Sequence, residues 1–186
     1  MIASVILGHL TSMSPQRTAD LPRDAVGIYG LIDHTGCLSH IGSTSSSAEN
    51  FCKRIHQRHR TGSETHSHYF SKAYNSCRMW RHPKLDRGNA DTKVANDLRS
   101  AFIAEYCRAV WFAMDADKPK IERIEKAVIA AAPPEYRRWN ANTDIRYSEP
   151  ESLVDALMKK LCFSRNQRAA VERQQERFLR SGVFPA

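Results

Sequence analysis

The stretch that decides the fold is residues 25–44, AVGIYGLIDHTGCLSHIGST. It contains two apolar runs, residues 26–33 and 37–42, on either side of a polar triplet whose glycine can adopt the positive φ of a tight turn. Apolar runs of this length around a turn are typical of a β-hairpin. We therefore expect two antiparallel strands that carry Tyr29 and His40 at neighbouring places.

The chain beyond the hairpin alternates helical patterns with one further strand. Apolar residues recur at helical spacing in residues 48–60, 66–81 and 120–132. Residues 106–114 are rich in aromatic and branched side chains, which favours a third strand, whereas the pattern of residues 93–105 leaves a helix as one choice among others. These elements predict an α+β fold, with a small, mainly antiparallel sheet of three strands flanked by helices.

Both ends of the chain are expected to lie outside this central domain, which we place at residues 24–142. Residues 1–23 begin with the apolar run MIASVILGHL, which lacks the basic start and the cleavage site of a secretion signal and predicts a strand or a docking arm. Residues 143–186 carry leucines repeated every four positions and then a charged tail, which predicts a helical C-terminal extension.

The composition limits the class of protein. The chain has 186 residues, of which 41% are hydrophobic, and no apolar run approaches the ~20 residues that a membrane-spanning helix needs. Its five cysteines are odd in number, widely spaced and without a C-x-x-C pair. This pattern argues against a zinc ribbon or a disulfide framework and favours a reducing, intracellular location in the cytoplasm. We expect a globular protein with no membrane partner.

Positive charge is concentrated in one part of the chain. The formal net charge is +8, and residues 52–87 hold nine Lys and Arg against two acidic residues, which gives +7 for that segment alone. A one-sided positive field attracts polyphosphate, and the release of counterions supplies affinity without sequence choice. The alternative is a solvated basic face that binds no partner.

The last predicted helix of the central domain carries an acid on its apolar face. Ile121, Ile124, Val128 and Ile129 form one stripe at helical spacing, and Glu125 lies inside that stripe. Burying a carboxylate is costly unless it binds a cation or a strong donor. Glu125 therefore has a partner, either a divalent metal ion or one of the many arginines.

The helix after the hairpin combines arginines with a histidine. His59 lies four residues after Ile55 and continues the inner apolar stripe, while Arg54 and Arg58 flank that stripe one turn apart. Two guanidiniums at this spacing can clamp a phosphate, because the planar fork matches its oxygens. Taken alone, the two side chains fit a solvated surface better than a phosphate clamp.

The order of these parts resembles the GIY-YIG nuclease family over residues 24–142. The triplet Gly27-Ile28-Tyr29 matches the first motif of that family, and ten residues separate Tyr29 from the triplet His40-Ile41-Gly42. The next residues complete the run GST, which is similar to the small polar loop of the family. The resemblance implies a GIY-YIG-like fold and the hydrolysis of DNA phosphodiester bonds with one Mg²⁺ or Mn²⁺.

The resemblance also implies roles for individual residues. Tyr29 would be the general base that activates water, or part of its relay. Arg54 would hold the scissile phosphate, Glu125 would bind the metal ion, and Asn140 would support the site. His40 stands where the family has a second tyrosine, and a histidine there can still accept or relay a proton.

One place in the arginine helix departs from the family pattern. The family often has His or Tyr four residues after the arginine. Here that place is Arg58, and His59 is one residue further on. Either Arg54 or Arg58 could therefore be the essential arginine, and we prefer Arg54.

DNA is accordingly the expected partner, with a homodimer as one arrangement that a palindromic site would favour. The residues expected to contact DNA are Gly42, Ser43, Thr44, Lys53, Arg60, Lys72, Arg78 and Arg81. The modest extensions favour a site-specific enzyme of a restriction system. The alternatives are a phage or mobile-element nuclease, a toxin-like or structure-specific repair nuclease, and a nucleic-acid-binding protein of the same fold without catalysis.

Overall fold

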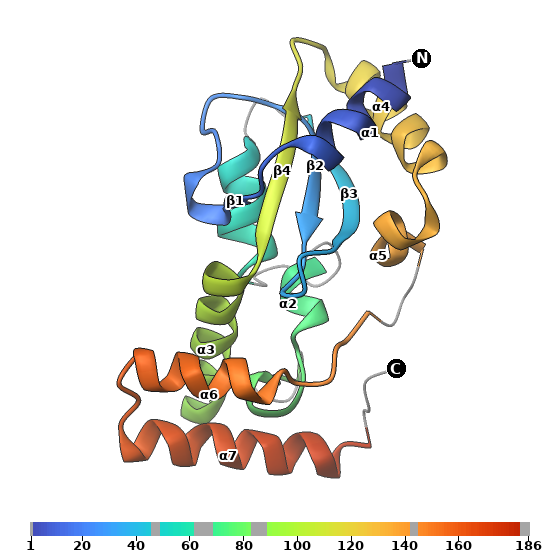
Figure 1. Ribbon diagram of the computed structural model, residues 1–186. Coiled ribbons are helices and arrows are strands. Elements are labelled where there is room, and N and C mark those ends of the chain that lie inside the picture. The colour runs from blue at the N-terminus through green and yellow to red at the C-terminus, as the bar shows by residue number, and fades with distance from the viewer. Residues whose placement is uncertain (1, 46–48, 62–68, 83–88, 142–144, 183–186) are drawn as a thin grey trace. The chain divides into compact units, whose positions relative to one another are not determined.

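A computed structural model of the chain describes residues 2–45, 49–61, 69–82, 89–141 and 145–182. By its internal contacts the chain divides into two compact units (Figure 1). Unit 1 combines Met1–Arg60 with Ala104–Thr143, and unit 2 combines Thr61–Ile103 with Asp144–Ala186. Each unit therefore joins two separate stretches of sequence.

Unit 1 contains an antiparallel sheet of four strands. The strands are β1 (Gln16–Arg17), β2 (Gly27–Ile32), β3 (Leu38–Thr44) and β4 (Arg108–Ala113), in the order β1-β4-β2-β3. The α+β class is as predicted, but the prediction of three strands was wrong. The additional strand β1 has two residues, too few for the side-chain alternation by which a strand is recognised in a sequence.

The predicted hairpin is confirmed as the pair β2 and β3. Tyr29 lies opposite Gly42 and His40 lies opposite Leu31. At the turn, Gly36 has a φ of 83°. The predicted polar loop, however, starts later than expected, because Ser43 and Thr44 still pair with β2.

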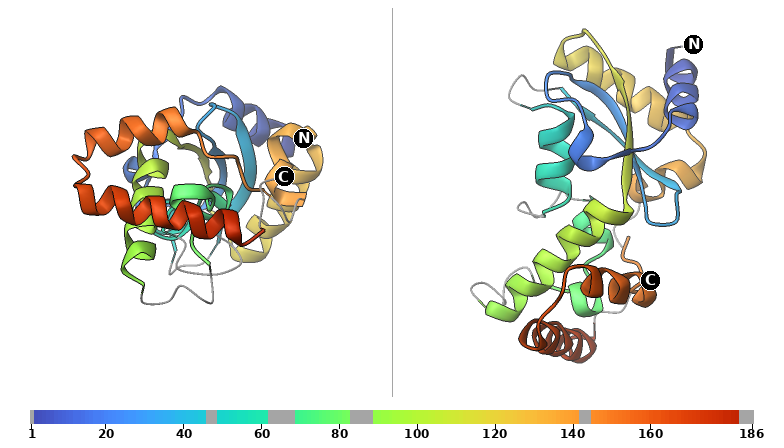
Figure 2. Two further views of the ribbon diagram at one scale, coloured as in Figure 1. Left: turned by 90° about the horizontal axis from the view of Figure 1, so that it is seen from below. Right: turned by 60° about the vertical axis from the view of Figure 1, so that its left-hand side comes forward.

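One face of this sheet is covered by two helices, α1 (Ile2–Ser12) and α4 (Lys118–Ala131), as Figure 2 shows. The apolar stripe of α4 and the buried side chains of α1 share one core with Ile28 and Ile41. A strand, one of the two predictions for the N-terminus, is therefore wrong, because the segment forms a helix. Its buried Ile6 and Leu10 are four residues apart, which places both on one helix face.

The other face of the sheet is covered by η2 (Cys52–His59), which is a π-helix (Figure 2). The preceding residue, Phe51, packs at a tilt against Trp111 of β4, with ring centroids 6.4 Å apart, and Ile55 is fully buried. A short helix η1 (Thr18–Asp20) precedes β2, while η4 (Pro134–Arg137) and α5 (Arg138–Ala141) follow α4.

In the described part of unit 2, the regular elements are helices. They are α2 (Tyr69–Ala73), η3 (Cys77–Met79), most of α3 (Ala90–Tyr106), α6 (Glu151–Lys160) and α7 (Arg165–Arg180). The segment whose pattern was ambiguous in the sequence is thus part of the helix α3. The predicted helix at residues 66–81 was too long: its first three residues lie outside the described part, and α2 ends at Ala73.

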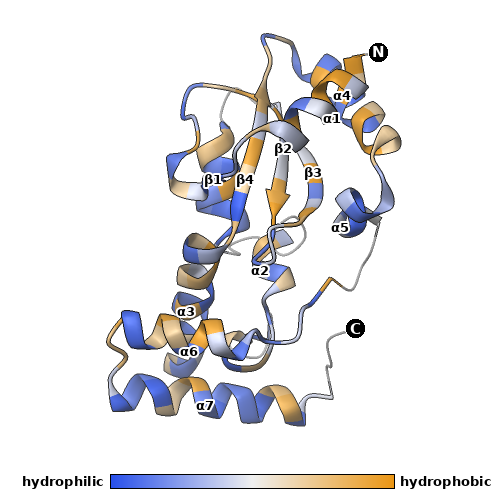
Figure 3. Ribbon diagram, viewed as in Figure 1, coloured by the Kyte–Doolittle hydropathy of each residue, from blue (hydrophilic) through white to orange (hydrophobic). Residues whose placement is uncertain are grey.

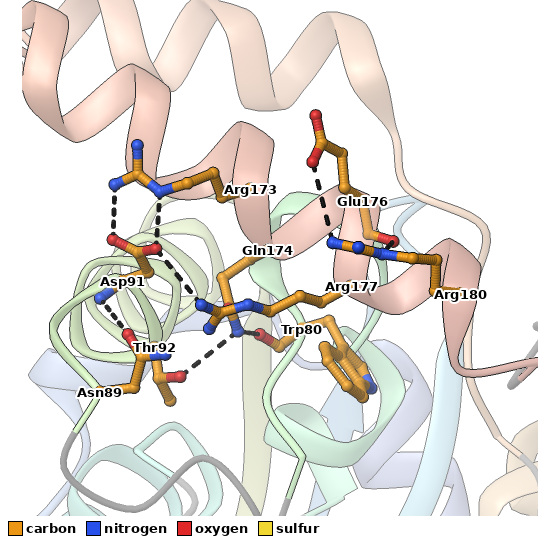
Figure 4. A network of polar contacts seen from close by, with 9 residues as sticks. All are labelled: Trp80, Asn89, Asp91, Thr92, Arg173, Gln174, Glu176, Arg177 and Arg180. Carbon is orange, nitrogen blue, oxygen red and sulfur yellow. Dashed lines mark hydrogen bonds and ion pairs between the residues drawn. The ribbon is translucent and has the colours of Figure 1, made fainter.

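A buried glutamine joins the helices of unit 2 (Figure 4). The side-chain amide of Gln174 on α7 donates to the carbonyl of Trp80 at 2.9 Å and lies 3.4 Å from the Thr92 hydroxyl on α3. Near it, Arg173 donates to both carboxylate oxygens of Asp91, at 2.7 and 2.8 Å. The exposed side of α7 is largely hydrophilic (Figure 3). On its inner side Val171 and Phe178 are buried, and the Phe178 ring lies 5.9 Å from that of Trp80, so apolar packing attaches α7 together with these polar contacts.

Candidate functional site

The centre of the candidate site is a hydrogen bond between a phenol and an imidazole. The hydroxyl of Tyr29, on β2, lies 2.8 Å from Nε2 of His59, on η2. Tyr29 is 1% exposed and His59 is fully buried. The two residues are 30 positions apart, and the packing of η2 on the sheet brings them together.

His40 completes a cluster of three aromatic polar side chains. Its ring centroid is 6.1 Å from that of Tyr29 and 6.2 Å from that of His59. Gly42 makes room for this cluster, since a Cβ atom there would lie 2.6 Å from the Tyr29 hydroxyl and 2.9 Å from Nε2 of His40. Glycine at the third position of the triplet His40-Ile41-Gly42 is therefore a packing requirement of the site.

Burial controls the charge of His40. Desolvation is the largest cause that lowers the pKa of His40 to about 3; the positive charge of Arg54 acts in the same direction, and a hydrogen bond with Asn140 opposes both. At neutral pH the imidazole is therefore uncharged. With a pKa so far below its ordinary value, the imidazole is a weaker base than the sequence led us to expect.

The winding of η2 explains how Arg54 and His59 face the same cluster. In an α-helix, side chains five positions apart point about 140° away from each other. A π-helix closes its turns with i to i+5 hydrogen bonds, and here the amide of Arg60 bonds to the carbonyl of Ile55 at 3.1 Å. His59, the fifth residue after Arg54, therefore points to nearly the same side of the helix as Arg54.

Both arginines of η2 are engaged by one carboxylate that the sequence interpretation missed. Glu49 forms an ion pair with Arg58, and its Oε1 lies 3.8 Å from a guanidinium nitrogen of Arg54. The Glu49 side chain is 14% exposed. No periodicity in the sequence links a residue in the loop before the helix with the helix's own arginines, so this contact emerges only in the folded chain.

Glu125 lies on the opposite face of the sheet from Tyr29. It projects from α4 and accepts a hydrogen bond of 2.6 Å from the hydroxyl of Ser43, which is the residue after Gly42. β3 is an edge strand of the sheet, so side chains from both faces can reach the same edge. The charge of Arg54 acts on Glu125 as well as on His40, which places the guanidinium within electrostatic reach of both.

The carboxyl group of Glu125 has a raised pKa. Desolvation by burial is the largest cause, and the charge of Glu122 adds to it, whereas the Ser43 hydrogen bond and the charge of Arg54 lower the pKa. The inward-facing position on α4 is thus as predicted, although the direct partner is a serine hydroxyl. The sequence had offered a metal ion or an arginine.

Asn140 fastens the edge strand that carries these groups. Its Oδ1 accepts from the amide of Ile41 at 3.0 Å and its Nδ2 donates to the carbonyl of the same residue at 2.6 Å. Two residues earlier, Arg138 donates to the Ser39 hydroxyl at 3.0 Å and pairs with Asp33. An edge strand otherwise leaves such backbone groups without a protein partner.

The donor set near Glu125 fits one mode of magnesium binding. Mg²⁺ is commonly held by one or two carboxylates together with substrate phosphates and water. Glu125 and the Ser43 hydroxyl offer oxygen donors of the right kind. Among the residues that the structure describes, no group of three His, Cys, Asp or Glu side chains gathers into a metal-binding cluster. The described residues therefore do not form a metal site from protein side chains alone.

The residues expected to contact DNA are found in different settings. In unit 1, Thr44 is buried, Lys53 is exposed, and Arg60 donates through Nε to the carbonyl of His56 at 2.9 Å. In unit 2, Lys72 is exposed and Arg81 is partly buried. The side chain of Arg78 is 13% exposed, and its guanidinium pairs with Glu149 and Asp155. Within the described structure, the guanidinium of Arg78 thus forms ion pairs inside unit 2.

Comparison of the chain with family models, with curated proteins and with solved structures gives no match. In the part of the chain that the structure describes, every helix is too short or too polar to span a bilayer. All five cysteines are free thiols, and those at positions 37 and 162 are exposed.

Proposed function

We propose that unit 1 is a divalent-metal-dependent endonuclease of the GIY-YIG type that hydrolyses phosphodiester bonds in DNA. The observation that supports it best is the Tyr29–His59 hydrogen bond beside Gly42, one residue along β3 from the serine that holds Glu125. A base, a cationic group and a carboxylate at one sheet edge are the parts that water attack on a phosphate requires.

Tyr29 and His59 together can move a proton. A free phenol with a pKa of ~10 is a poor base near neutral pH. With Nε2 of His59 as acceptor at 2.8 Å, the phenolic proton can pass to the imidazole while the phenol oxygen takes a proton from the attacking water. The pair is thereby a stronger base than tyrosine alone.

Arg54 is assigned to the phosphate. Its charge already acts on His40 and Glu125, so a phosphate placed between those residues would lie in its field. A guanidinium fork matches two phosphate oxygens and stabilises the extra negative charge of the transition state. Arg58 lies on the same helix and would assist in binding.

Glu125 and Ser43 are assigned to Mg²⁺ or Mn²⁺. When bound, such an ion supplies charge neutralisation on the phosphate and on the leaving 3′ oxygen. The role of Ser43 is to fix the orientation of the carboxylate through its 2.6 Å hydrogen bond. Asn140 holds β3 in place through both backbone groups of Ile41.

The biological setting that we propose is a site-specific restriction-type enzyme in the cytoplasm, which dimerises where its DNA site is palindromic. A phage or mobile-element, toxin-like or repair nuclease would use the same residues. One observation favours a second function, a nucleic-acid-binding protein without catalysis. Tyr29 is only 1% exposed, as a phenol with a purely structural role in the hairpin would also be.

Cleavage assays separate these functions. Supercoiled and single-stranded DNA are incubated with Mg²⁺ or EDTA and with wild type, Tyr29→Phe, Arg54→Ala or Glu125→Ala. We expect metal-dependent nicking by the wild type and losses of about a hundredfold or more in each variant. Wild-type protein that binds DNA without ever cutting it would establish the binding function instead.

A further inference from the structure

The two guanidiniums of η2 already hold an anionic group in the free protein. Glu49 pairs with Arg58 and lies 3.8 Å from Arg54 through the same oxygen, Oε1. The carboxylate side chain is 14% exposed, against 21% for Arg54 and 38% for Arg58. The acid is thus the least accessible member of the trio.

A carboxylate and a phosphate compete for guanidinium groups on similar terms. Both present oxygens that accept parallel N–H bonds from an arginine fork. The arginines that hold Glu49 include the one whose charge acts on His40 and Glu125. An incoming phosphate and Glu49 therefore seek the same cations.

We propose that Glu49 is an internal competitor, which occupies the phosphate subsite of Arg54 and Arg58 until a nucleic-acid phosphate displaces it. This inference rests on the proposed function, because that function assigns these arginines to substrate phosphate. Glu49 lowers the affinity of the subsite for any single phosphate anion. Nucleic acid overcomes this competition because its other phosphates contribute additional contacts.

The test measures anion binding with the full chain. Wild type, Glu49→Gln and the control Glu135→Gln are compared at equal ionic strength in EDTA. Glu135 is exposed in η4, so its substitution changes the net charge equally without touching the arginine pair. The probes are inorganic phosphate, read as a rise in the thermal midpoint, and a duplex oligonucleotide, read as its Kd.

We expect Glu49→Gln to bind both probes about two- to fivefold more tightly than wild type, as the release of a partly exposed ion pair allows. The plot of log Kobs against log salt for the duplex becomes steeper by up to about 0.9, the slope of one additional phosphate contact. Equal binding by Glu49→Gln and wild type, or an equal gain in Glu135→Gln, overturns the proposal.

A second variant covers the case in which Glu49→Gln does not fold. Glu49→Asp keeps the charge but shortens the reach to two guanidiniums, so we expect an intermediate gain for phosphate; no gain overturns the proposal in that case. Failure of the nuclease function gives a different pattern. Glu49→Gln then gains affinity for inorganic phosphate while wild type neither binds the duplex nor cuts DNA.

Discussion

At the scale of single residues, Gly42 is the position where packing most clearly leaves no room for a side chain. A methyl group there would lie 2.6 Å from the Tyr29 hydroxyl, closer than any non-bonded contact allows. We predict that Gly42→Ala destabilises the fold by about 1–3 kcal/mol and displaces the phenol. Chemical denaturation gives the free energy of unfolding, and plasmid nicking gives the activity.

Gly8→Ala is the matched control for that substitution. Gly8 lies within α1, and a Cβ atom there meets no atom within 4 Å. The control should raise stability by roughly 0.5–1 kcal/mol, because alanine is favoured over glycine inside helices. Equal stability of the two alanine variants would contradict the tight packing at Gly42.

The pKa of His40 makes the stability of the protein depend on pH. Because this pKa is about 3 in the folded chain, against the 6.5 of an ordinary histidine, the unfolded chain binds a proton between these values and the folded chain does not. Stability should therefore fall as pH decreases from 6.5 toward 3, by up to about 1.4 kcal/mol per pH unit from this residue.

Denaturation at several pH values compares wild type with His40→Asn, which cannot titrate. The variant should show a shallower loss of stability in acid than the wild type. Parallel curves for the two proteins between pH 6.5 and 3 would mean that His40 is not held neutral by burial.

At the scale of elements, the π-helix η2 determines which residues reach the site. The double exchange Arg58→His with His59→Arg puts the histidine where an α-helix would present it, four residues after Arg54. We predict that this variant loses cleavage as completely as His59→Ala, because the Tyr29 hydroxyl bonds to the side chain at position 59. Cleavage near the wild-type rate by the exchanged protein would refute the winding described for this helix.

The limits of sequence interpretation are also visible in the elements. The β2–β3 hairpin and the helix α4 followed from runs of apolar residues at strand or helix spacing. The run in α1 is too densely apolar to choose between the two periods, and β1 is too short to have one. The π-helical register of η2 depends on hydrogen bonding that residue spacing does not encode.

In the candidate site, too, some residues could be predicted from the sequence and some contacts could not. The hairpin motif and the inward-facing acid of α4 drew attention to Tyr29 and Glu125. The Ser43–Glu125 hydrogen bond joins residues 82 positions apart, and the Glu49 pairs depend on a loop conformation. Contacts of this kind follow from tertiary packing, which a single sequence does not reveal.

In unit 2, a buried arginine links α3 with the η3 turn. Arg99 is 2% exposed and donates to the side chains of Asn75 and Asn96, each at 2.5 Å, and to the carbonyl of Met79 at 2.9 Å. Burial, with a smaller effect from the charge of Arg81, lowers the pKa of Arg99 to about 9. A branched guanidinium is needed to reach all three acceptors.

Arg99→Lys should therefore lower the free energy of unfolding by about 2 kcal/mol, because a single ammonium group leaves buried acceptors without donors. The exposed Arg165→Lys is the control and should change stability by less than about 0.5 kcal/mol. Chemical denaturation measures both variants. Equal stability of Arg99→Lys and wild type would show that the acceptors find other donors.

At the scale of the whole molecule, a phenol and a carboxylate approach one edge strand from opposite faces of the sheet. The central claim of the proposed function is that both groups act on a single substrate phosphate. The net charge of +8 favours a polyanionic substrate, but it does not by itself require that these two residues cooperate.

The most direct test is a double-mutant cycle on the single-turnover rate of plasmid nicking in Mg²⁺, with Tyr29→Phe, Glu125→Gln and the combined variant at saturating protein. We predict that each single change slows the reaction by about a hundredfold or more and that the double variant is little slower than the worse single variant, as for residues that work as a unit. A cleavage rate near wild type in either single variant, or losses that simply multiply in the double variant, would contradict the claim.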